Sequence, residues 1–404
     1  MSENGSKIWC RNLWKVFGPR PDAIIDTASE DSTKEQILEE TGHVIAVRDV
    51  SFEVKENEIF VVMGLSGSGK STLIRCINRL IEPTRGAVCI EGADIARMND
   101  TELRNLRRHK LSMVFQNFGL LPHRTVLDNV AFGLEVRGEG RKERHEKALQ
   151  MLEQVGLKGW EKNRIHELSG GMQQRVGLAR ALASGAETLL MDEAFSALDP
   201  LIRRQMQDEF LNLHTTVKRT VIFITHDLGE ALKLGDRIAI MRGGEIVQIG
   251  SPEEIVTRPA DDYVSEFVRD VPKGKVLYAQ SIMEEPSTVI QSDQSIDDAI
   301  EAMRLKEGDW TFIIDGTGRI KGTLTLEDAR AAVGKGLSKA GEAARSEFAS
   351  TSPDVTLERC LSLVTEESNI PVAVLDDERH LLGVITRPAL FEAIQPDDTD
   401  GKQN

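Results

Sequence analysis

Apolar runs and segments of mixed polarity alternate along the first two thirds of the chain. The runs have the length and composition of strands and occupy residues 7–18, 45–54, 59–63, 86–90, 111–116, 188–193 and 220–227. Apolar positions spaced among polar ones predict helices over residues 72–80, 100–110, 126–137, 141–156 and 172–183. The pattern therefore predicts strands that each lead through a short loop into a helix.

Residues 19–44 interrupt the connection between the first two predicted strands. Ser32 and Glu35 have the spacing of a capping box, and Gly42 provides a helix stop. A weaker helical turn surrounds Ile24. We expect a short helical insertion, acidic on its exposed side, that is a surface feature or a contact for a partner.

The last third of the chain contains an internal repeat. A linker over residues 271–277 precedes two segments that each read helix, strand, turn, strand, helix. Corresponding positions, such as Gly322 and Gly383, lie about 60 residues apart. A repeat of this kind predicts a tandem module that is separate from the preceding domain.

Length and composition narrow the class of protein. A chain of 404 residues predicts two or three domains. The sequence contains no run of 18 or more apolar residues, so we expect no membrane-spanning helix. The N-terminus lacks the pattern of a secretory signal, and the four scattered cysteines fit a reducing cytoplasm. A net charge of −15 argues against general nucleic-acid binding.

One glycine-rich loop carries the clearest chemistry. It fits the P-loop pattern and lies between a predicted buried strand and a predicted helix. Backbone N–H groups of such a loop turn toward an anion, and the helix N-terminus adds a positive dipole. Lys70 can then reach the β- and γ-phosphates of a nucleotide, and Ser71 can ligate Mg²⁺. The predicted ATP-binding residues of the loop are Gly64, Leu65, Ser66, Gly67, Ser68, Gly69, Lys70, Ser71 and Thr72.

A second candidate anion site lies at the start of the helix predicted over 172–183. Ser169 is a good N-cap, and Gly170 and Gly171 leave backbone N–H groups accessible there. Other polar side chains come at the ends of predicted strands, namely Gln116, Asp192, Glu193 and His226, and Asp199 follows on a loop. The order and spacing of these motifs are more informative than any one of them.

Three aromatic residues in residues 7–18 are unusual for a chain with few aromatics. Phe17, directly before Gly18, is our candidate for stacking on an adenine ring. The alternative is that all three aromatics pack in the core, as aromatic side chains mostly do.

Together these motifs resemble the full set found in ABC transporter ATPases, and the resemblance covers about residues 7–270. It implies an α/β fold with a RecA-like core, an antiparallel β subdomain and a helical subdomain. It also implies roles at the nucleotide: Ser71 and Gln116 ligate Mg²⁺, with Asp192 acting through water. Glu193 is then the general base, and His226 contacts the γ-phosphate; Lys70 and Gln116 complete the catalytic set.

The resemblance further implies a head-to-tail homodimer with two ATP molecules between the subunits. Ser169, Gly170, Gly171 and Asp199 would then contact the ATP held by the other copy. A membrane permease would dock near Gln116 and residues 117–123. ATP binding would close the dimer, and hydrolysis would open it.

The repeat in the last third looks like a tandem CBS module, with copies over 278–336 and 337–396 and a flexible tail over 397–404. Thr325 and Asp328 keep the family's pattern for ribose and phosphate, whereas Ala389 replaces the acid in the second copy. At most one adenine-nucleotide site is therefore expected, and a purely structural dimerisation module is the alternative. The excess of acidic residues over 273–404 makes a simple lipid-binding patch a poor interpretation.

One ABC ATPase domain followed by tandem CBS domains resembles the ATPase subunit of quaternary-amine importers, which take up osmoprotectants such as glycine betaine. The resemblance implies a peripheral protein at the cytoplasmic face of the plasma membrane, with a permease and, through it, a solute-binding protein as partners. An importer for a different solute is one alternative. Another is a soluble ABC protein or CBS sensor that is not coupled to transport, although such ABC proteins usually carry two ATPase domains or a long coiled coil.

Overall fold

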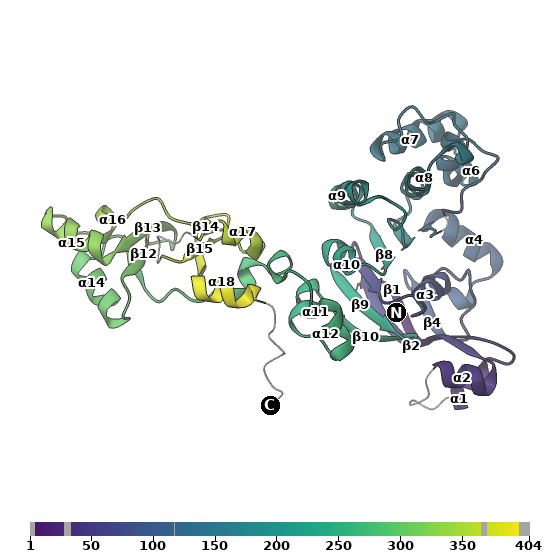
Figure 1. Ribbon diagram of the computed structural model, residues 1–404. Helices are drawn as coiled ribbons and strands as arrows, with labels where there is room; N and C mark the ends of the chain where they lie inside the picture. The colour runs from purple at the N-terminus through teal and green to yellow at the C-terminus, as the bar shows by residue number, and fades with distance from the viewer. Residues whose placement is uncertain (1–4, 28–33, 117, 365–369, 396–404) are drawn as a thin grey trace. The chain divides into compact units, whose positions relative to one another are not determined.

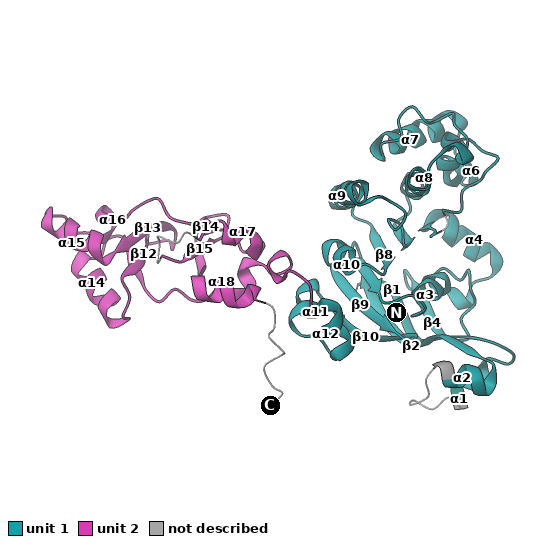
Figure 2. Ribbon diagram, viewed as in Figure 1, with its two compact units in different colours: residues 1–268 teal, residues 269–404 magenta. Residues whose placement is uncertain are grey.

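The structure of the protein, a computed structural model, describes residues 5–27, 34–116, 118–364 and 370–395. The chain divides into two units, residues 1–268 and residues 269–404 (Figure 2). The sequence predicted the end of the first domain at residue 270. Each unit is described separately below.

An antiparallel sheet with strand order β2-β1-β4-β5 contains the N-terminal strands of the first unit. Its strands are β1 (Ser6–Phe17), β2 (Val44–Lys55), β4 (Arg85–Ile90) and β5 (Ala93–Asp94). Two short helices, α1 (Asp22–Thr27) and α2 (Lys34–Thr41), occupy the β1–β2 connection and confirm the helical insertion. Ile24 and Ile37 hold these helices on the sheet by packing against Val16 and Ile45. The predicted capping box involves Ser32, which lies outside the described residues.

A six-stranded sheet with order β10-β9-β3-β8-β7-β6 forms the centre of the first unit. All neighbouring pairs are parallel except β9 with β10. Its strands are β3 (Ile59–Met63), β6 (Leu111–Val114), β7 (Thr188–Asp192), β8 (Thr220–Thr225), β9 (Arg237–Arg242) and β10 (Glu245–Gly250). The central strands β3, β7 and β8 are buried along their whole length, which explains why they consist mainly of apolar residues, with polar residues at strand ends.

Helices of the first unit connect these strands and form a separate helical group. The connecting helices are α3 (Lys70–Ile77), η1 (Ile95–Arg97), α4 (Asp100–His109), α9 (Pro200–Val217), α10 (Leu228–Leu234), α11 (Pro252–Thr257) and α12 (Asp262–Val268). The helical group contains α5 (Val126–Val130), α6 (Phe132–Val136), α7 (Arg141–Gln154), η2 (Ile165–Glu167) and α8 (Gly170–Ala183) (Figure 1). The single helix predicted over 126–137 is therefore two short helices, and the helix predicted from 172 begins at Gly170.

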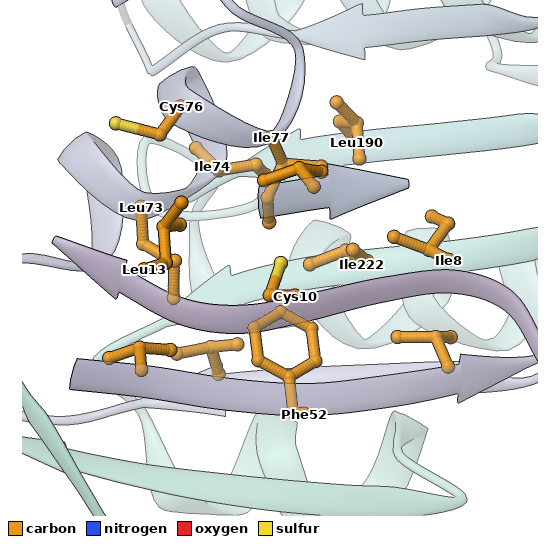
Figure 3. Close-up of a cluster of buried hydrophobic side chains, with 14 of the residues drawn as sticks. Ile8, Cys10, Leu13, Phe52, Leu73, Ile74, Cys76, Ile77, Leu190 and Ile222 are labelled. Atoms are coloured by element: carbon orange, nitrogen blue, oxygen red, sulfur yellow. The ribbon is translucent and has the colours of Figure 1, made fainter. Parts of the chain in front are cut away.

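The main apolar core of the first unit lies between its two sheets. Figure 3 shows Cys10 and Leu13 of β1 on the side of Leu73, Ile74 and Ile77 of α3, and Ile8 of the same strand beside Ile222. Leu190 and Ile222, from β7 and β8, belong to the same cluster. Each of these side chains is buried, and full burial of one such residue contributes roughly 1.5–3 kcal/mol. The helix that follows the glycine-rich loop is therefore fixed on both sides.

The second unit contains two small sheets with the same topology, β11-β12-β13 and β14-β15-β16. The strands are β11 (Val289–Gln291), β12 (Trp310–Ile314), β13 (Ile320–Thr325), β14 (Ser350–Thr351), β15 (Val372–Leu375) and β16 (Leu381–Ile385). The helices are η3 (Lys273–Lys275), α13 (Ala279–Ile282), α14 (Ile296–Leu305), α15 (Leu326–Gly334), α16 (Ala340–Ala343), α17 (Leu357–Leu361) and α18 (Arg387–Ile394). The predicted order of helix, two strands and helix is present in both copies, and the short parallel strands β11 and β14 are additions to it.

A shared apolar cluster joins the two copies within this unit. Phe312 and Ile320 of the first copy pack with Ala373, Leu375 and Val384 of the second.

Over the ranges that the structure describes, none of the helices is both long and apolar enough to cross a bilayer.

Candidate active site

The glycine-rich loop leads from β3 into α3, as the sequence predicts. Gly64 and Gly69 have positive φ angles of 155° and 102°. A Cβ at Gly64 would collide with the carbonyl oxygen of Met241, and one at Gly69 with that of Ala46. Gly69 precedes α3 and provides no side-chain cap, so the N–H groups of the first turn remain available to an anion.

Lys70 lies in the loop with its ammonium group directed at the loop itself. Its Nζ donates to the carbonyl oxygens of Gly64 at 2.7 Å and Leu65 at 2.9 Å. Burial lowers the pKa of Lys70, and the nearby carboxylates of Glu193 and Asp192 oppose that shift. The cation is therefore close to both acids that the sequence predicts at the end of β7.

Ser71 and Asp192 are brought together across the first unit. The Ser71 hydroxyl donates to Asp192 Oδ1 at 2.8 Å. Asp192 is fully buried, and its Oδ2 has no hydrogen-bond partner, although the Arg75 guanidinium lies 3.6 Å away. Burial raises the pKa of Asp192, whereas Ser71 and Arg75 act in the opposite direction. A buried carboxylate of this kind favours a neighbouring cation.

Glu193 contacts Gln116 and His226, the other two predicted catalytic residues besides Lys70. Gln116 Nε2 donates to Glu193 Oε2 at 3.1 Å, and His226 Nδ1 lies 3.3 Å from Glu193 Oε1. Glu193 has a φ of +50°, a strained conformation for a residue with a side chain, and its N–H donates to the Ile224 carbonyl. The strand before Gln116 is shorter than predicted: β6 ends at Val114, so Gln116 lies on the following loop.

Two further residues belong to this site and were not assigned from the sequence. Gln174 is buried; its Nε2 donates to the Glu193 carbonyl at 3.2 Å, and its Oε1 accepts from the Ala197 N–H at 3.1 Å. Arg75, the second, lies one helical turn after Ser71 and therefore on the same face of α3. That spacing was a usable signal, whereas nothing in the sequence distinguishes Gln174 from Gln173.

The second candidate anion site is at the surface of the first unit. Ser169 caps α8 by accepting from the Met172 N–H at 3.3 Å, and Asp199 caps α9 by accepting from the Ile202 N–H at 3.1 Å. Both residues are exposed. Gly170 and Gly171 form the first turn of α8, where an added Cβ at Gly170 would meet open space.

Phe17 ends β1 and is 41% exposed, so core packing does not apply to it. The Lys15 ammonium lies 4.9 Å from the centre of its ring. The exposed ring remains the candidate for contact with an adenine.

In the second unit, Thr325 and Asp328 are adjacent at the start of α15. The Thr325 hydroxyl donates to Asp328 Oδ2 at 2.8 Å, and Arg345 pairs with Asp328 Oδ1 at 2.5 Å. In the second copy, Thr386 caps α18 by accepting from the Ala389 N–H, with no acid at that position. The two copies therefore differ as the sequence predicts.

Family models and relatives agree on what this chain is. The model described as "ABC transporter" matches residues 47–196, and the model described as "CBS domain" matches residues 279–335 and 340–396. The glycine betaine transport ATP-binding protein of Bacillus subtilis is 46% identical over 98% of this chain and 94% of its own length. The chain belongs to the ABC transporter ATP-binding subunits with tandem CBS domains. Its activity is ATP hydrolysis coupled to transport.

Two other relatives of this ATP-binding subunit support the same family assignment. The glycine betaine/proline betaine transport ATP-binding protein of Escherichia coli is 45% identical over 98% of this chain and 99% of its own length. A dimeric ATP-binding cassette solved with ADP and phosphate is 31% identical, with a TM-score of 0.53 over 61% of this chain and 98% of the other. The expected ATPase fold is thereby confirmed, and that relative is a dimer.

Proposed function

We propose that this ATP-binding subunit powers an importer for a quaternary-amine osmoprotectant such as glycine betaine. The observation that carries the proposal is the extent of the similarity. Relatives named for glycine betaine transport match 98% of the chain, including the CBS repeat as well as the ATPase unit. The solute class comes from these relatives, since the subunit itself is expected to contact only ATP and its partners.

ATP would bind at the glycine-rich loop. In this proposal, Lys70 and the N–H groups of the loop and the first turn of α3 hold the β- and γ-phosphates. Phe17 contacts the adenine ring. Ser71 and Gln116, with Asp192 through water, would hold a magnesium ion. The residues fit it, because a hydroxyl and a buried carboxylate oxygen without a hydrogen-bond partner are hard oxygen ligands. The ion would neutralise charge on the phosphate oxygens.

Glu193 would act as the general base that takes a proton from the attacking water. Its two oxygens are directed by Gln116 and His226, and its strained backbone is fixed by the bond from its N–H to Ile224. His226 would orient the water by contacting the γ-phosphate as well. Gln174 acts on Glu193 only through the main chain, so it is a positioning residue.

We name Ser169, Gly170 and Gly171, at the start of α8, the signature residues; their surface position supports a shared site. Ser169 and Asp199 are exposed, and their described hydrogen bonds stay within their own helix ends. We propose that Ser169, Gly170, Gly171 and Asp199 contact the ATP of a second copy. Hydrolysis would then require a homodimer that closes around two nucleotides.

A permease would dock beside the loop that follows Gln116. A cavity of about 340 Å³ lies there, lined by Leu80, Phe115 and Gly119 among others. The part of the predicted docking loop at residue 117 lies outside the described residues. The proposal places the subunit at the cytoplasmic face of the membrane, and a solute-binding protein would reach the complex through the permease.

The CBS module would serve regulation, with Thr325 and Asp328 as the candidate contacts for an adenine nucleotide. Arg345 already pairs with Asp328, so a ribose or phosphate would have to share or displace that contact. Calorimetry with ATP, ADP and AMP on the Lys70→Ala chain, at nucleotide concentrations too low to fill its weakened glycine-rich loop, reports on the CBS site. Binding that Asp328→Ala removes supports the site; heat that Asp328→Ala leaves unchanged contradicts it.

Affinity purification from detergent-solubilised native membranes tests the transport proposal. We expect a polytopic permease to co-purify, and ATP-dependent uptake of labelled glycine betaine when the complex is placed in liposomes. Uptake of another solute, without competition by glycine betaine, would contradict the solute class. Recovery with ribosomal or DNA-bound proteins would contradict the transport partner.

A further inference from the structure

A second cavity lies at the opposite end of β7 and β8 from the catalytic acids. Leu189 and Val221, near the starts of these strands, form part of its wall. Met151 of α7 and Phe210 of α9 face it from the helical group and from the central part of the unit. The cavity has a volume of about 310 Å³, at the lower end of the range for small-molecule sites.

Most of the wall is apolar, but three cations and one acid border it. Lys147 pairs with Glu139 at 2.7 Å, so that charge is compensated. Within the described part of the chain, the hydrogen bonds of the two arginines, Arg137 and Arg219, go to main-chain carbonyls. Arg137 donates to the carbonyls of residues 108 and 109, and Arg219 donates to the Leu182 carbonyl at 3.2 and 3.3 Å.

Neither arginine has a carboxylate within ion-pair distance among the interactions of the described residues. Burial lowers the pKa of both Arg137 and Arg219, and the charge of Arg137 adds to the lowering at Arg219. Glu139, which is paired with Lys147, opposes the shift at Arg137. Two guanidinium groups that are partly removed from water, repel each other and have no carboxylate within ion-pair distance are costly. An anion between them would offset that cost.

We propose that this cavity binds a small amphipathic anion, a carboxylate or sulfonate on an apolar ring or short chain. The apolar body would lie against Met151, Leu189 and Phe210. The anionic group would lie at the rim with Arg137 and Arg219, which supply charge-assisted hydrogen bonds. The mixture of an apolar floor and two cations without an ion-paired carboxylate excludes a metal ion and disfavours a strongly hydrated ion such as free phosphate.

The position of the cavity connects it to the ATP site through three elements. The C-terminal end of α8 borders the cavity, and its N-terminal end carries Ser169 and the signature glycines. The strands β7 and β8 begin at the cavity and end at Asp192 and before His226. A ligand there contacts the same rigid elements that position the catalytic groups, so it is placed to modulate ATP hydrolysis.

A matched pair of dyes tests the site in the full-length chain. The sulfonate 1-anilinonaphthalene-8-sulfonate and the neutral N-phenyl-1-naphthylamine share a ring system and differ in charge. Fluorescence titrations are made with excess ADP, which fills the nucleotide site. We expect one sulfonate per chain, bound about tenfold more tightly than the neutral dye. Equal affinities, or binding that ADP abolishes, would overturn the proposal.

Substitutions locate the binding. Arg137→Gln should weaken the sulfonate about tenfold and leave the neutral dye unchanged. Arg104→Gln is the matched control, because Arg104 is exposed on α4 and does not border the cavity. If Arg137→Gln and Arg104→Gln change the affinity for the sulfonate by the same factor, the sulfonate does not bind in this cavity. Leu213→Trp is a second variant, which fills the cavity while keeping both arginines. It decides the test if Arg137→Gln loses its helical circular dichroism and so does not fold. Unchanged sulfonate binding to Leu213→Trp would then overturn the proposal, and a loss of sulfonate binding would support it.

Discussion

Two strand-to-helix junctions of this protein differ in whether the N–H groups of the first helical turn already have a hydrogen-bond partner. At the β3–α3 junction, the residue before the helix is Gly69, which cannot cap it, and Lys70 adds a positive charge. At the β13–α15 junction, the Thr325 hydroxyl accepts from the N–H of Asp328, and the Asp328 carboxylate adds a negative charge to the first turn. The first junction leaves its N–H groups for an external anion, whereas the second satisfies its own.

The surroundings of the two junctions extend this difference. Lys70 and Asp192 are 5% and 0% exposed, and Asp192 accepts from Ser71, which lies 121 residues earlier in the sequence. Asp328 instead pairs with exposed Arg345, which lies within the residue range of the second CBS copy. The comparison predicts that substitutions at the first junction change chemistry and that those at the second change mainly stability.

The largest effect, on the rate of ATP turnover, is expected from Glu193→Gln. Glutamine keeps the contacts to Gln116 and His226 but cannot take a proton, so steady-state ATP turnover should fall about 10²–10⁴-fold. Nucleotide affinity should remain within about twofold, because the phosphate-binding loop is unchanged. Turnover assays with Glu187→Gln as the control measure this. Ordinary turnover by Glu193→Gln would refute the general-base role.

Lys70→Ala should weaken ATP binding about 10–100-fold, the cost of one lost charge-assisted contact. Equilibrium binding of a fluorescent ATP analogue measures the change. Lys142→Ala is the control and should bind ATP normally, because Lys142 is exposed on α7 and lies outside the glycine-rich loop. A Lys70→Ala chain with unchanged affinity would show that the two junctions do not differ in the way described.

Thr325→Ala should cost about 1 kcal/mol in the unfolding free energy of the second unit, since the α15 cap is lost. ATP turnover should stay the same. Thr386→Ala is the matched change, because Thr386 caps α18 in the second copy without an acid nearby. Urea unfolding followed by circular dichroism gives both values. A loss of turnover with no change in stability would contradict the comparison.

The smallest effect is expected at an exposed charge cluster that joins the two sheets of the first unit. Lys110 and Lys7 donate to Glu187 and lower its pKa to about 2. A folded-state pKa below the unfolded value of about 4.3 stabilises the fold above that value. The contribution disappears as pH falls from about 4.3 to 2.

Because half of the Glu187 side chain is exposed, the contribution should stay below about 1 kcal/mol. Glu187→Gln should therefore differ from the unsubstituted chain at pH 7 by that amount and converge with it near pH 2. Urea unfolding at both pH values checks the sign. A difference that grows as pH falls would reverse it.

The sequence predicts the parts of the site that depend on local order. The glycine-rich loop, the cap at Ser169 and the acids at the end of β7 all follow from short patterns with fixed spacing. The boundary at Val114 and the break after Val130 do not, because helix and strand ends depend on tertiary contacts. Gln174 is similar: its role arises from packing of α8 against the strand end, which no local pattern encodes.

The CBS repeat shows the same limit. Its period and the difference between Asp328 and Ala389 are visible in the sequence. The ion pair with Arg345 is not, since it joins α15 to a segment 17 residues later whose backbone pairs with Thr323. The cavity bordered by Arg137 and Arg219 also required the structure, because its wall comes from residues between 134 and 221.

The shared nature of the ATP site is the central claim, and mixing two defective chains tests it directly. Lys70→Ala removes the phosphate contact, and Ser169→Arg blocks the signature; each chain alone should be inactive. If the signature completes the site of a second copy, a mixed dimer contains one intact site, and partial ATP turnover should return on mixing. A mixture as inactive as its components, with dimers shown to form, would contradict the shared site.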